Sequence, residues 1–313
     1  SVAIGYQALE AQNLTTATDV YNVAIGFDAG QAITTGVQNT LIGGLAGDAI
    51  TTGRYNTSLG YQSLSNETTG EFNTAIGYNA LATQNRTDGT DNYNTGVGAS
   101  AGEQLTSGIQ NTLIGALSGD ALTTGQENVA LGYAALSNDD VGNHSTAIGW
   151  NALISQNYAT STDSNNTAVG WNAGSSISTG INNTLIGSHT GDALTDADAN
   201  VAVGFAALGL DTLGSKSTAI GRSALATQNF TTATDSYNTA VGFYAGLNVT
   251  TGIKNTIIGG LAGDQLADAD FNTAVGYGSL STDDLGSKST AVGAFALEAQ
   301  NYATATDSHN TAV

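Results

Sequence analysis

The sequence predicts an all-β fold, a parallel β-solenoid in which short coils stack on one another. A five-residue phrase, first met as Ser1-Val2-Ala3-Ile4-Gly5, returns along the whole of the 313 residues. By type it reads Asn or Ser, Thr or Val, a small or apolar residue, then Ile, Val or Leu, and Gly. β-Branched residues that close on a glycine indicate a short strand. Helix is excluded as the main state, because no stretch has a 3.6-residue apolar period and 41 glycines penalise it.

The spacing of the phrase predicts how the coils are organised. Successive copies begin 21, 17, 17 and 17 residues apart, and this set repeats with a superperiod of 72 residues. In such a chain each repeat contacts only its neighbours, and the core grows in one dimension. We therefore expect one continuous repeat region over residues 1–313, a fragment of a longer chain, with superperiods that start at 1, 73, 145, 217 and 289.

Counting positions from the Asn or Ser of each coil, position 4 is always Ile, Val or Leu and is predicted to be the core residue. Position 3 is mostly small and apolar, and position 5 is Gly. Because side chains alternate across a strand, both faces of the strand are fit for burial. One face would line the coil interior, and the other would meet a neighbouring chain or a second part of the same coil. A weaker second strand is expected in each coil.

Position 1 and the polar turn carry the remaining structural predictions. Position 1 is Asn in fourteen of eighteen coils and Ser in the rest, which suits a ladder in which each side chain bonds its copies above and below. The turn Thr34-Thr35-Gly36 is typical of the coil ends. Its glycine suits a positive φ, and its Thr supplies local hydrogen bonds. Ala197 and Ala269 occupy the glycine slot in two coils, so the turn accepts an ordinary residue there.

Composition excludes several classes of partner. The chain has 6 basic and 26 acidic residues, a net charge of -20, and nucleic acid and anionic membranes both require clustered Lys and Arg. The absence of Cys rules out disulfides and thiol chemistry. No apolar run reaches the length of a membrane span.

No catalytic constellation is evident, so we expect no enzyme, no cofactor and no resident metal. Two acidic pairs lie in equivalent turns and are interpreted as solvated: Asp139-Asp140 and Asp283-Asp284. The histidines fall at different places in their coils and are not expected to form one site: His144, His189 and His309. Stray Ca²⁺ at two Asp-rich stretches is the alternative, at Asp196 and Asp198 and at Asp268 and Asp270.

The phrase Ser1-Val2-Ala3-Ile4-Gly5, with Ala a few residues on, resembles the head repeats of trimeric autotransporter adhesins. That resemblance implies a left-handed parallel β-roll of three chains joined side by side. The longer form Asn-Thr-Ala-Ile-Gly-Tyr-Asn-Ala-Leu at 73–81, with Thr-Thr-Gly in the turns, is similar to repeats of phage tail-fibre proteins, which often carry a self-cleaving chaperone domain. Both resemblances imply a fibre that displays or binds at a surface, extracellular or on a virion.

An aromatic residue follows the glycine in ten of seventeen coils and is the candidate for binding. Such a stripe could stack on glycan rings. The alternative, which we favour, is that the rings cover the coil corner or the seam between chains. The ten residues are Tyr6, Phe27, Tyr61, Tyr78, Tyr133, Trp150, Trp171, Phe205, Phe243 and Tyr277.

The sequence therefore predicts the structural shaft of an extracellular fibre or filament that self-associates, as a homotrimer or a filament, and displays or adheres at a surface. A phage tail-fibre shaft or receptor-binding fibre is the alternative. Lateral binding of a host glycan or receptor, or of ice, is weaker. Ice binding lacks a second outward column of Thr, because apolar or small residues follow the strand Thr.

Overall fold

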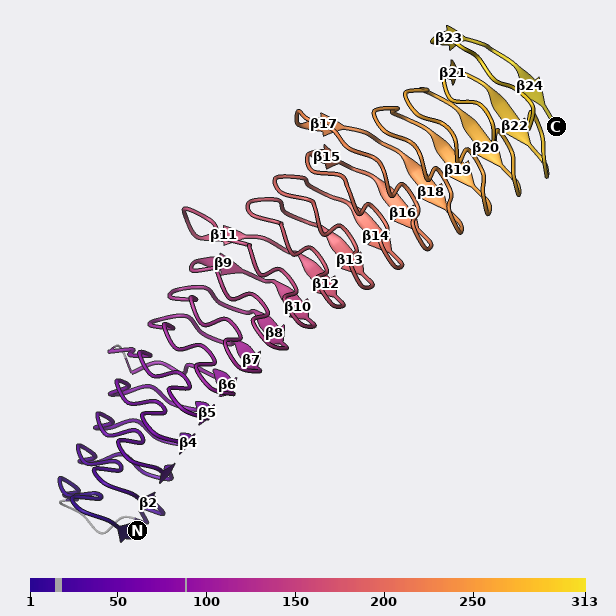
Figure 1. Ribbon diagram of the computed structural model, residues 1–313. Coiled ribbons are helices and arrows are strands. Elements are labelled where there is room, and N and C mark those ends of the chain that lie inside the picture. The colour runs from indigo at the N-terminus through magenta and orange to yellow at the C-terminus, as the bar shows by residue number, and fades with distance from the viewer. Residues whose placement is uncertain (15–18, 88) are drawn as a thin grey trace. The chain divides into compact units, whose positions relative to one another are not determined.

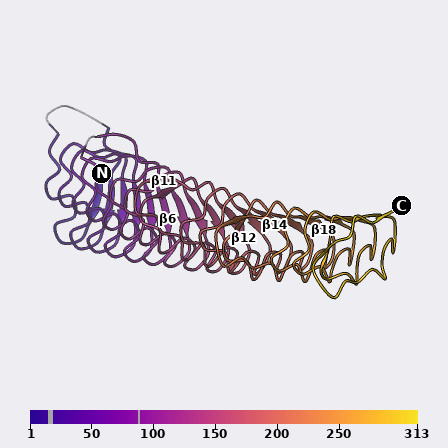
Figure 2. The same cartoon turned by 90° about the horizontal axis from the view of Figure 1, so that it is seen from above.

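The computed structural model describes residues 1–14, 19–87 and 89–313. They form two compact units, an N-terminal unit of Ser1–Asn151 with Ser155–Asp163 and a C-terminal unit of Ala152–Ile154 with Ser164–Val313. Each unit is a parallel β-solenoid, and the described residues contain no helix (Figures 1 and 2). The predicted fold class is confirmed.

One three-residue strand per coil builds the sheet of the N-terminal unit, and neighbouring coils pair in parallel with equivalent residues opposite one another, as in Thr40 with Thr57. Two shorter strands, β9 and β11, pair with each other away from that sheet. The strands are β1 Val2–Ile4, β2 Val23–Ile25, β3 Thr40–Ile42, β4 Thr57–Leu59, β5 Thr74–Ile76, β6 Thr95–Val97, β7 Thr112–Ile114, β8 Val129–Leu131, β9 Gly142–Asn143, β10 Thr146–Ile148 and β11 Thr162–Asp163.

The C-terminal unit follows the same plan, with parallel in-register pairs such as Thr239 with Thr256. Its short strands pair as β15 with β17 and β21 with β23. The strands are β12 Thr167–Val169, β13 Thr184–Ile186, β14 Val201–Val203, β15 Gly214–Ser215, β16 Thr218–Ile220, β17 Thr234–Asp235, β18 Thr239–Val241, β19 Thr256–Ile258, β20 Thr273–Val275, β21 Gly286–Ser287, β22 Thr290–Val292, β23 Thr306–Asp307 and β24 Thr311–Ala312.

The predicted orientation of the strand was wrong. Position 3 faces the interior, where Ala24, Leu41 and Ala75 are fully buried, whereas positions 2 and 4 face outward. The side chains alternate between the two faces of the strand as predicted. The interior, however, is too narrow for a large residue at every position 3. A Leu there is matched by glycine at position 9, since a Cβ on Gly47 would lie 2.9 Å from Leu41 Cδ2.

The expected second strand of each coil is also largely absent among the described residues. After position 5 the chain runs through turns whose amides bond to the next coil, as Gly30 N–H does to the Ala46 carbonyl at 3.0 Å. Second strands occur only where a fourth coil meets the 21-residue coil, as in β9 with β11. The stacking bonds therefore do not require a strand.

Glycine at position 5 is dictated by the approach of neighbouring coils. Gly115 has a φ of +133°, and a Cβ there would lie 2.3 Å from the Gly132 carbonyl oxygen. The same contact recurs along the column, with Gly132 facing Gly149. No side chain fits such a gap.

The asparagine ladder is present, and it bonds chiefly to backbone. Asn39 Nδ2 donates to the Gly53 carbonyl at 2.9 Å, and Asn39 Oδ1 accepts from the Asn56 amide at 3.0 Å. Direct bonding between copies is longer, 3.4 Å from Asn39 Nδ2 to Asn22 Oδ1. Each buried amide therefore satisfies two backbone groups on different coils.

The turn predictions need two corrections. Gly36 does not have a positive φ; it is small because a Cβ would lie 2.4 Å from the Gly53 carbonyl oxygen. Thr34 Oγ1 donates to the Thr51 carbonyl of the next coil at 3.2 Å, not locally. The turn is held by stacking, which a single coil viewed as sequence does not reveal.

The interpretation of Asp139 and Asp283 as solvated was also wrong, since both are fully buried. Asp139 Oδ1 accepts from the Gly142 amide at 3.0 Å, and Asp139 Oδ2 accepts from Gln156 Nε2 at 2.6 Å. Burial raises the pKa of Asp139, against the hydrogen bond from Gln156. The partner Gln, seventeen residues on, was the signal that could have revealed a buried acid.

Candidate functional site: an exposed sheet face between two aromatic columns

The side chains at positions 2 and 4 form an exposed surface in each unit, here called the outer sheet face. Position 2 is mainly Thr and position 4 is aliphatic, so the second outward column is not Thr. The most exposed aliphatic residues at position 4 have 36% to 58% of their surface accessible to solvent. They are Ile4, Leu59, Leu131, Ile186, Ile220, Ile258 and Val292. Apolar side chains that recur on the surface at the same position of many coils are unusual for a monomer.

The ten aromatic residues predicted at position 6 form the first column, along one border of the outer sheet face. All ten are between 45% and 66% exposed. In the N-terminal unit, neighbouring rings stack, with centroids 5.4 Å apart for Tyr6 and Phe27 and 5.9 Å for Tyr61 and Tyr78. The rings therefore stand on the surface of the chain and contact each other between coils.

A second aromatic column, which the sequence interpretation missed, borders the opposite side of the outer sheet face. Its members directly precede position 1 and are 37% to 64% exposed. Tyr55, Phe72 and Tyr93 stack with centroids 4.8 Å and 5.0 Å apart. The signal was an aromatic residue directly before Asn; the column comprises Tyr21, Tyr55, Phe72, Tyr93, Tyr237 and Phe271.

The backbone aims this second column outward. Phe72 has a φ of 60° and Tyr93 one of 53°, values that a non-glycine residue adopts only when its surroundings hold it there. The constraint comes from hydrogen bonds on each side, as the Phe72 amide donates to the Arg54 carbonyl at 3.3 Å. The outward direction of these aromatic side chains is therefore a consequence of the stacking of the coils.

At the ends of three coils, Lys or His precedes position 1 in place of an aromatic residue and pairs with an Asp of the next, 21-residue coil. Lys216 Nζ lies 2.5 Å from Asp235 Oδ2, and Lys288 pairs with Asp307 in the same way. The hydrogen bond from Lys216 lowers the pKa of Asp235, and the bond to Asp235 raises the pKa of Lys216. His144 takes the equivalent place in the N-terminal unit, with its Nδ1 3.4 Å from Asp163 Oδ1.

The residues considered for Ca²⁺ contact the coil before them. Asp196 Oδ1 accepts from Thr179 Oγ1 at 2.6 Å, and Asp198 Oδ1 accepts from the Ile181 amide at 2.8 Å. Asp268 and Asp270 repeat both bonds. Among residues 1–14, 19–87 and 89–313, no three His, Asp or Glu side chains gather as a metal site would require.

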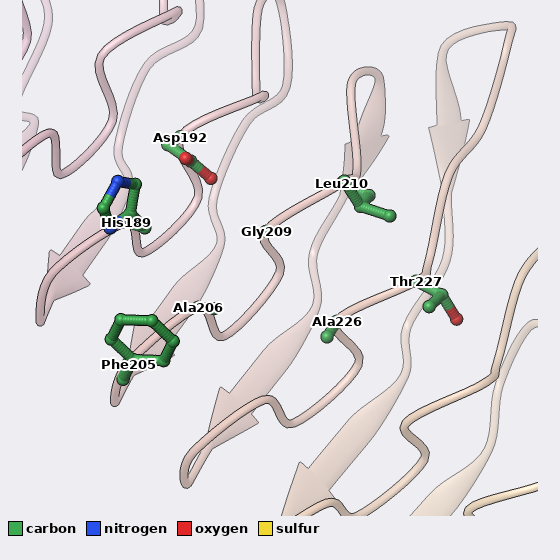
Figure 3. Close-up of a pocket in the computed structure, with 8 residues that line it drawn as sticks. All are labelled: His189, Asp192, Phe205, Ala206, Gly209, Leu210, Ala226 and Thr227. Atoms are coloured by element: carbon green, nitrogen blue, oxygen red, sulfur yellow. The ribbon is translucent and has the colours of Figure 1, made fainter.

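A well-formed pocket lies on the C-terminal unit and includes Phe205 of the first aromatic column in its lining. Its volume is about 350 Å³ (Figure 3). It is lined by His189, Asp192, Phe205, Ala206, Gly209, Leu210, Ala226 and Thr227. Of these, only Phe205 was a predicted site residue.

The fold and its surface define a repetitive β-solenoid with an exposed apolar face, an architecture suited to assembly. Two stretches, residues 124–152 and 213–234, match the model of the YadA head domain repeat, the repeat of a trimeric autotransporter adhesin. The resemblance to adhesin head repeats is therefore confirmed for these stretches. No curated protein and no solved structure matched the chain. The described part of the chain has no helix long and apolar enough to cross a membrane.

Proposed function

We propose that this chain is a structural segment of a cell-surface, adhesin-type fibre, and that its chains associate side by side through the outer sheet face. The observation that carries the proposal is the row of exposed aliphatic side chains at position 4. Similarity to the YadA head repeat supports the surface location and the adhesin class.

A second copy of the same chain is the partner that best fits this face. The rows repeat at every coil, so copies in register present the same residues to one another along the full contact. The face is also almost free of charge, which limits the repulsion expected between chains that each carry a net charge of -20. Burial of apolar area would then drive association at about 25 cal/mol per Å². We infer a homotrimer, the assembly of the similar adhesin heads.

Light scattering with mass determination tests this assembly. The expected mass is three times the 31.4 kDa of one chain. Replacing Val241 and Ile258 by Lys should lower the mass, because two charges would have to be buried in the interface. The matched control places Lys at Thr250 and Gln265, exposed turn residues of the same unit, and should leave the mass unchanged.

A single-chain mass for the wild type at every concentration would contradict the proposal, and so would an unchanged mass for the Val241 and Ile258 variant. Antibody labelling separates the two settings of such a fibre, because a cell-surface adhesin would label cells and a tail fibre would label virions.

Lateral glycan binding by the first aromatic column is the second candidate function. Its support is that the rings are about half exposed, so that the column presents aromatic surface to the solvent. An oligosaccharide array probed with the wild type and with Trp150→Ala and Trp171→Ala together is the comparison. Loss of binding in the double variant supports the column; unchanged binding removes it as the site.

A further inference from the structure

We propose that the pocket between His189 and Thr227 binds one pyranose ring of a saccharide, as a single binding site on a surface that otherwise repeats. The proposal rests on the second candidate function for its ligand class and is independent of the self-association. The observation that supports the proposal is that several residues lining this pocket depart from the 72-residue repeat.

Four of the pocket residues differ from all their equivalents in the other superperiods, although Phe205, which replaces Tyr61, Tyr133 and Tyr277, keeps an aromatic ring. His189 replaces Leu45, Leu117 and Leu261, and Gly209 replaces Ser65, Ser137 and Ser281. Leu210 replaces Asn66, Asn138 and Thr282. These changes are dispersed in sequence but meet around one cavity, which points to a local function rather than to the needs of the coil.

The changes also explain why the pocket is open. At the position equivalent to Gly209, Ser65 Oγ donates to the Ala82 carbonyl at 3.3 Å and so fills the space between two coils. Gly209 has no side chain to do this, and the neighbouring Ala206 and Ala226 are small. The result is a floor of small residues between the walls made by adjacent coils (Figure 3).

The chemistry of the walls matches a hydroxylated ring with apolar faces. Phe205 and Leu210 are 51% and 57% exposed, one at each side of the floor, and offer apolar surface. Asp192 and His189 lie together at one side, and Thr227 lies at the other (Figure 3). A carboxylate, an imidazole and a hydroxyl supply both acceptors and donors for sugar hydroxyls. Pockets that are mainly apolar with a few convergent polar groups are typical ligand sites.

The polar groups are partly organised before any ligand arrives. His189 Nδ1 lies 3.1 Å from Ser188 Oγ, so Nε2 is the ring nitrogen left for a ligand. The ring also packs edge-on against Trp171, with centroids 4.4 Å apart. Burial raises the pKa of Asp192, and the neighbouring His189 opposes that shift. Thr227 Oγ1 donates its proton to the Leu247 carbonyl at 2.7 Å, and its oxygen can accept from a sugar hydroxyl.

The test restores the repeat by changing His189→Leu, Gly209→Ser and Leu210→Asn together. These residues occupy the equivalent coils, so the variant should fold, and circular dichroism with a melting curve checks that it does. The fluorescently labelled chain is applied to immobilised oligosaccharides that end in neutral hexose, N-acetylhexosamine or sialic acid. We expect the wild type to be retained on at least one sugar, and the variant to bind it about tenfold or more weakly.

The matched gain-of-binding experiment builds the same pocket at the equivalent place in the N-terminal unit. The N-terminal unit already has Asp48, Ala82 and Thr83 at the positions of Asp192, Ala226 and Thr227. In the restored variant, the changes Leu45→His, Gln62→Ala, Ser65→Gly and Asn66→Leu should return retention on the same sugar.

The proposal would be overturned if the wild type were retained on none of the sugars, or if the restored variant were retained equally. It would also be overturned if calorimetry showed binding of hexylamine, a probe that is not a sugar, without binding of sugars. The failures are distinguishable from those of the other proposals. A variant with Tyr133→Ala and Trp150→Ala, whose rings stack on each other in the N-terminal unit, reports on the aromatic column. The mass of each variant reports on self-association.

Discussion

At the scale of single residues, buried asparagine amides and crowded glycines hold the coils together. Asn111 is fully buried; its Nδ2 donates to the Gly125 carbonyl at 2.9 Å and its Oδ1 accepts from the Asn128 amide at 3.0 Å. Buried backbone groups are costly when they lose a partner. One side chain thus connects the backbone of its own coil to that of the next.

Asn111→Ala should lower the free energy of unfolding by about 2–4 kcal/mol, because it leaves a buried carbonyl and a buried amide unpaired. Chemical denaturation measures the loss. The control is Gln110→Ala, an exposed neighbour, for which about 0.5 kcal/mol or less is expected. Equal effects of the two variants would contradict a special role for the ladder.

Gly115→Ala should be among the most damaging single changes, at about 3 kcal/mol or more, because it combines an unfavourable φ with a clash against backbone. The Cβ would lie 2.3 Å from the Gly132 carbonyl oxygen. The matched control is Gly260→Ala, where the nearest atom is 3.5 Å away in the Tyr277 ring and the equivalent Ala116 is an alanine. Thermal unfolding should separate the two; a tolerated Gly115→Ala would show that the coils can move apart.

At the scale of the coil, the 72-residue period has a physical basis in a buried acid paired with a glutamine. In the C-terminal unit, Asp211 Oδ1 accepts from the Gly214 amide at 3.0 Å. Asp211 Oδ2 accepts from Gln228 Nε2 at 2.5 Å. The first two 17-residue coils of each superperiod carry an aliphatic residue in the place of the acid, as Ile177 and Leu194 show. The acid therefore marks the coil that precedes the 21-residue one.

Gln228→Ala should destabilise the chain by about 2–3 kcal/mol, since the buried carboxylate of Asp211 loses a donor. A double-mutant cycle with Asp211→Asn, read by chemical denaturation, should give a coupling energy above about 1 kcal/mol. Additive effects would show that the two side chains do not act as a pair.

At the scale of the whole molecule, most carboxyl groups with a shifted pKa favour the neutral form. Burial is the largest cause of the raised pKa of Asp48, Asp120, Asp139, Asp192 and Asp264. The stability such a group adds is fully present below the ordinary Asp value of 3.8 and is lost as pH rises through its higher folded pKa. The exposed Asp235 and Asp307, whose pKa values are lowered by Lys216 and Lys288, lose their contribution only as pH falls below that value.

The melting temperature should therefore rise as pH falls from neutral towards the isoelectric point of 4.1, because groups with a raised pKa take up protons above the ordinary Asp value while the ion pairs stay intact. The range lies above the isoelectric point of 4.1, where the net charge vanishes. The control is Asp139→Asn, which should reduce the slope because the amide that replaces the carboxyl group does not titrate. A melting temperature that is flat or falls over this range would contradict the assignment.

The sequence by itself determined the parallel β-solenoid, the period of 72 residues, the asparagine column and the first aromatic column. These follow from spacing and residue type, because equivalent residues of stacked coils must lie above one another. The tertiary structure decided that Ala24 and Leu41 at position 3 point inward, that Asp139 is buried and that the aromatic residues before Asn form a second column. A strand of alternating apolar residues has two faces that the sequence cannot rank, and only the width of the closed coil selects which face is interior. The pocket at His189 also required the structure, because residues that depart from the repeat in two different coils become a site only when stacking brings them together.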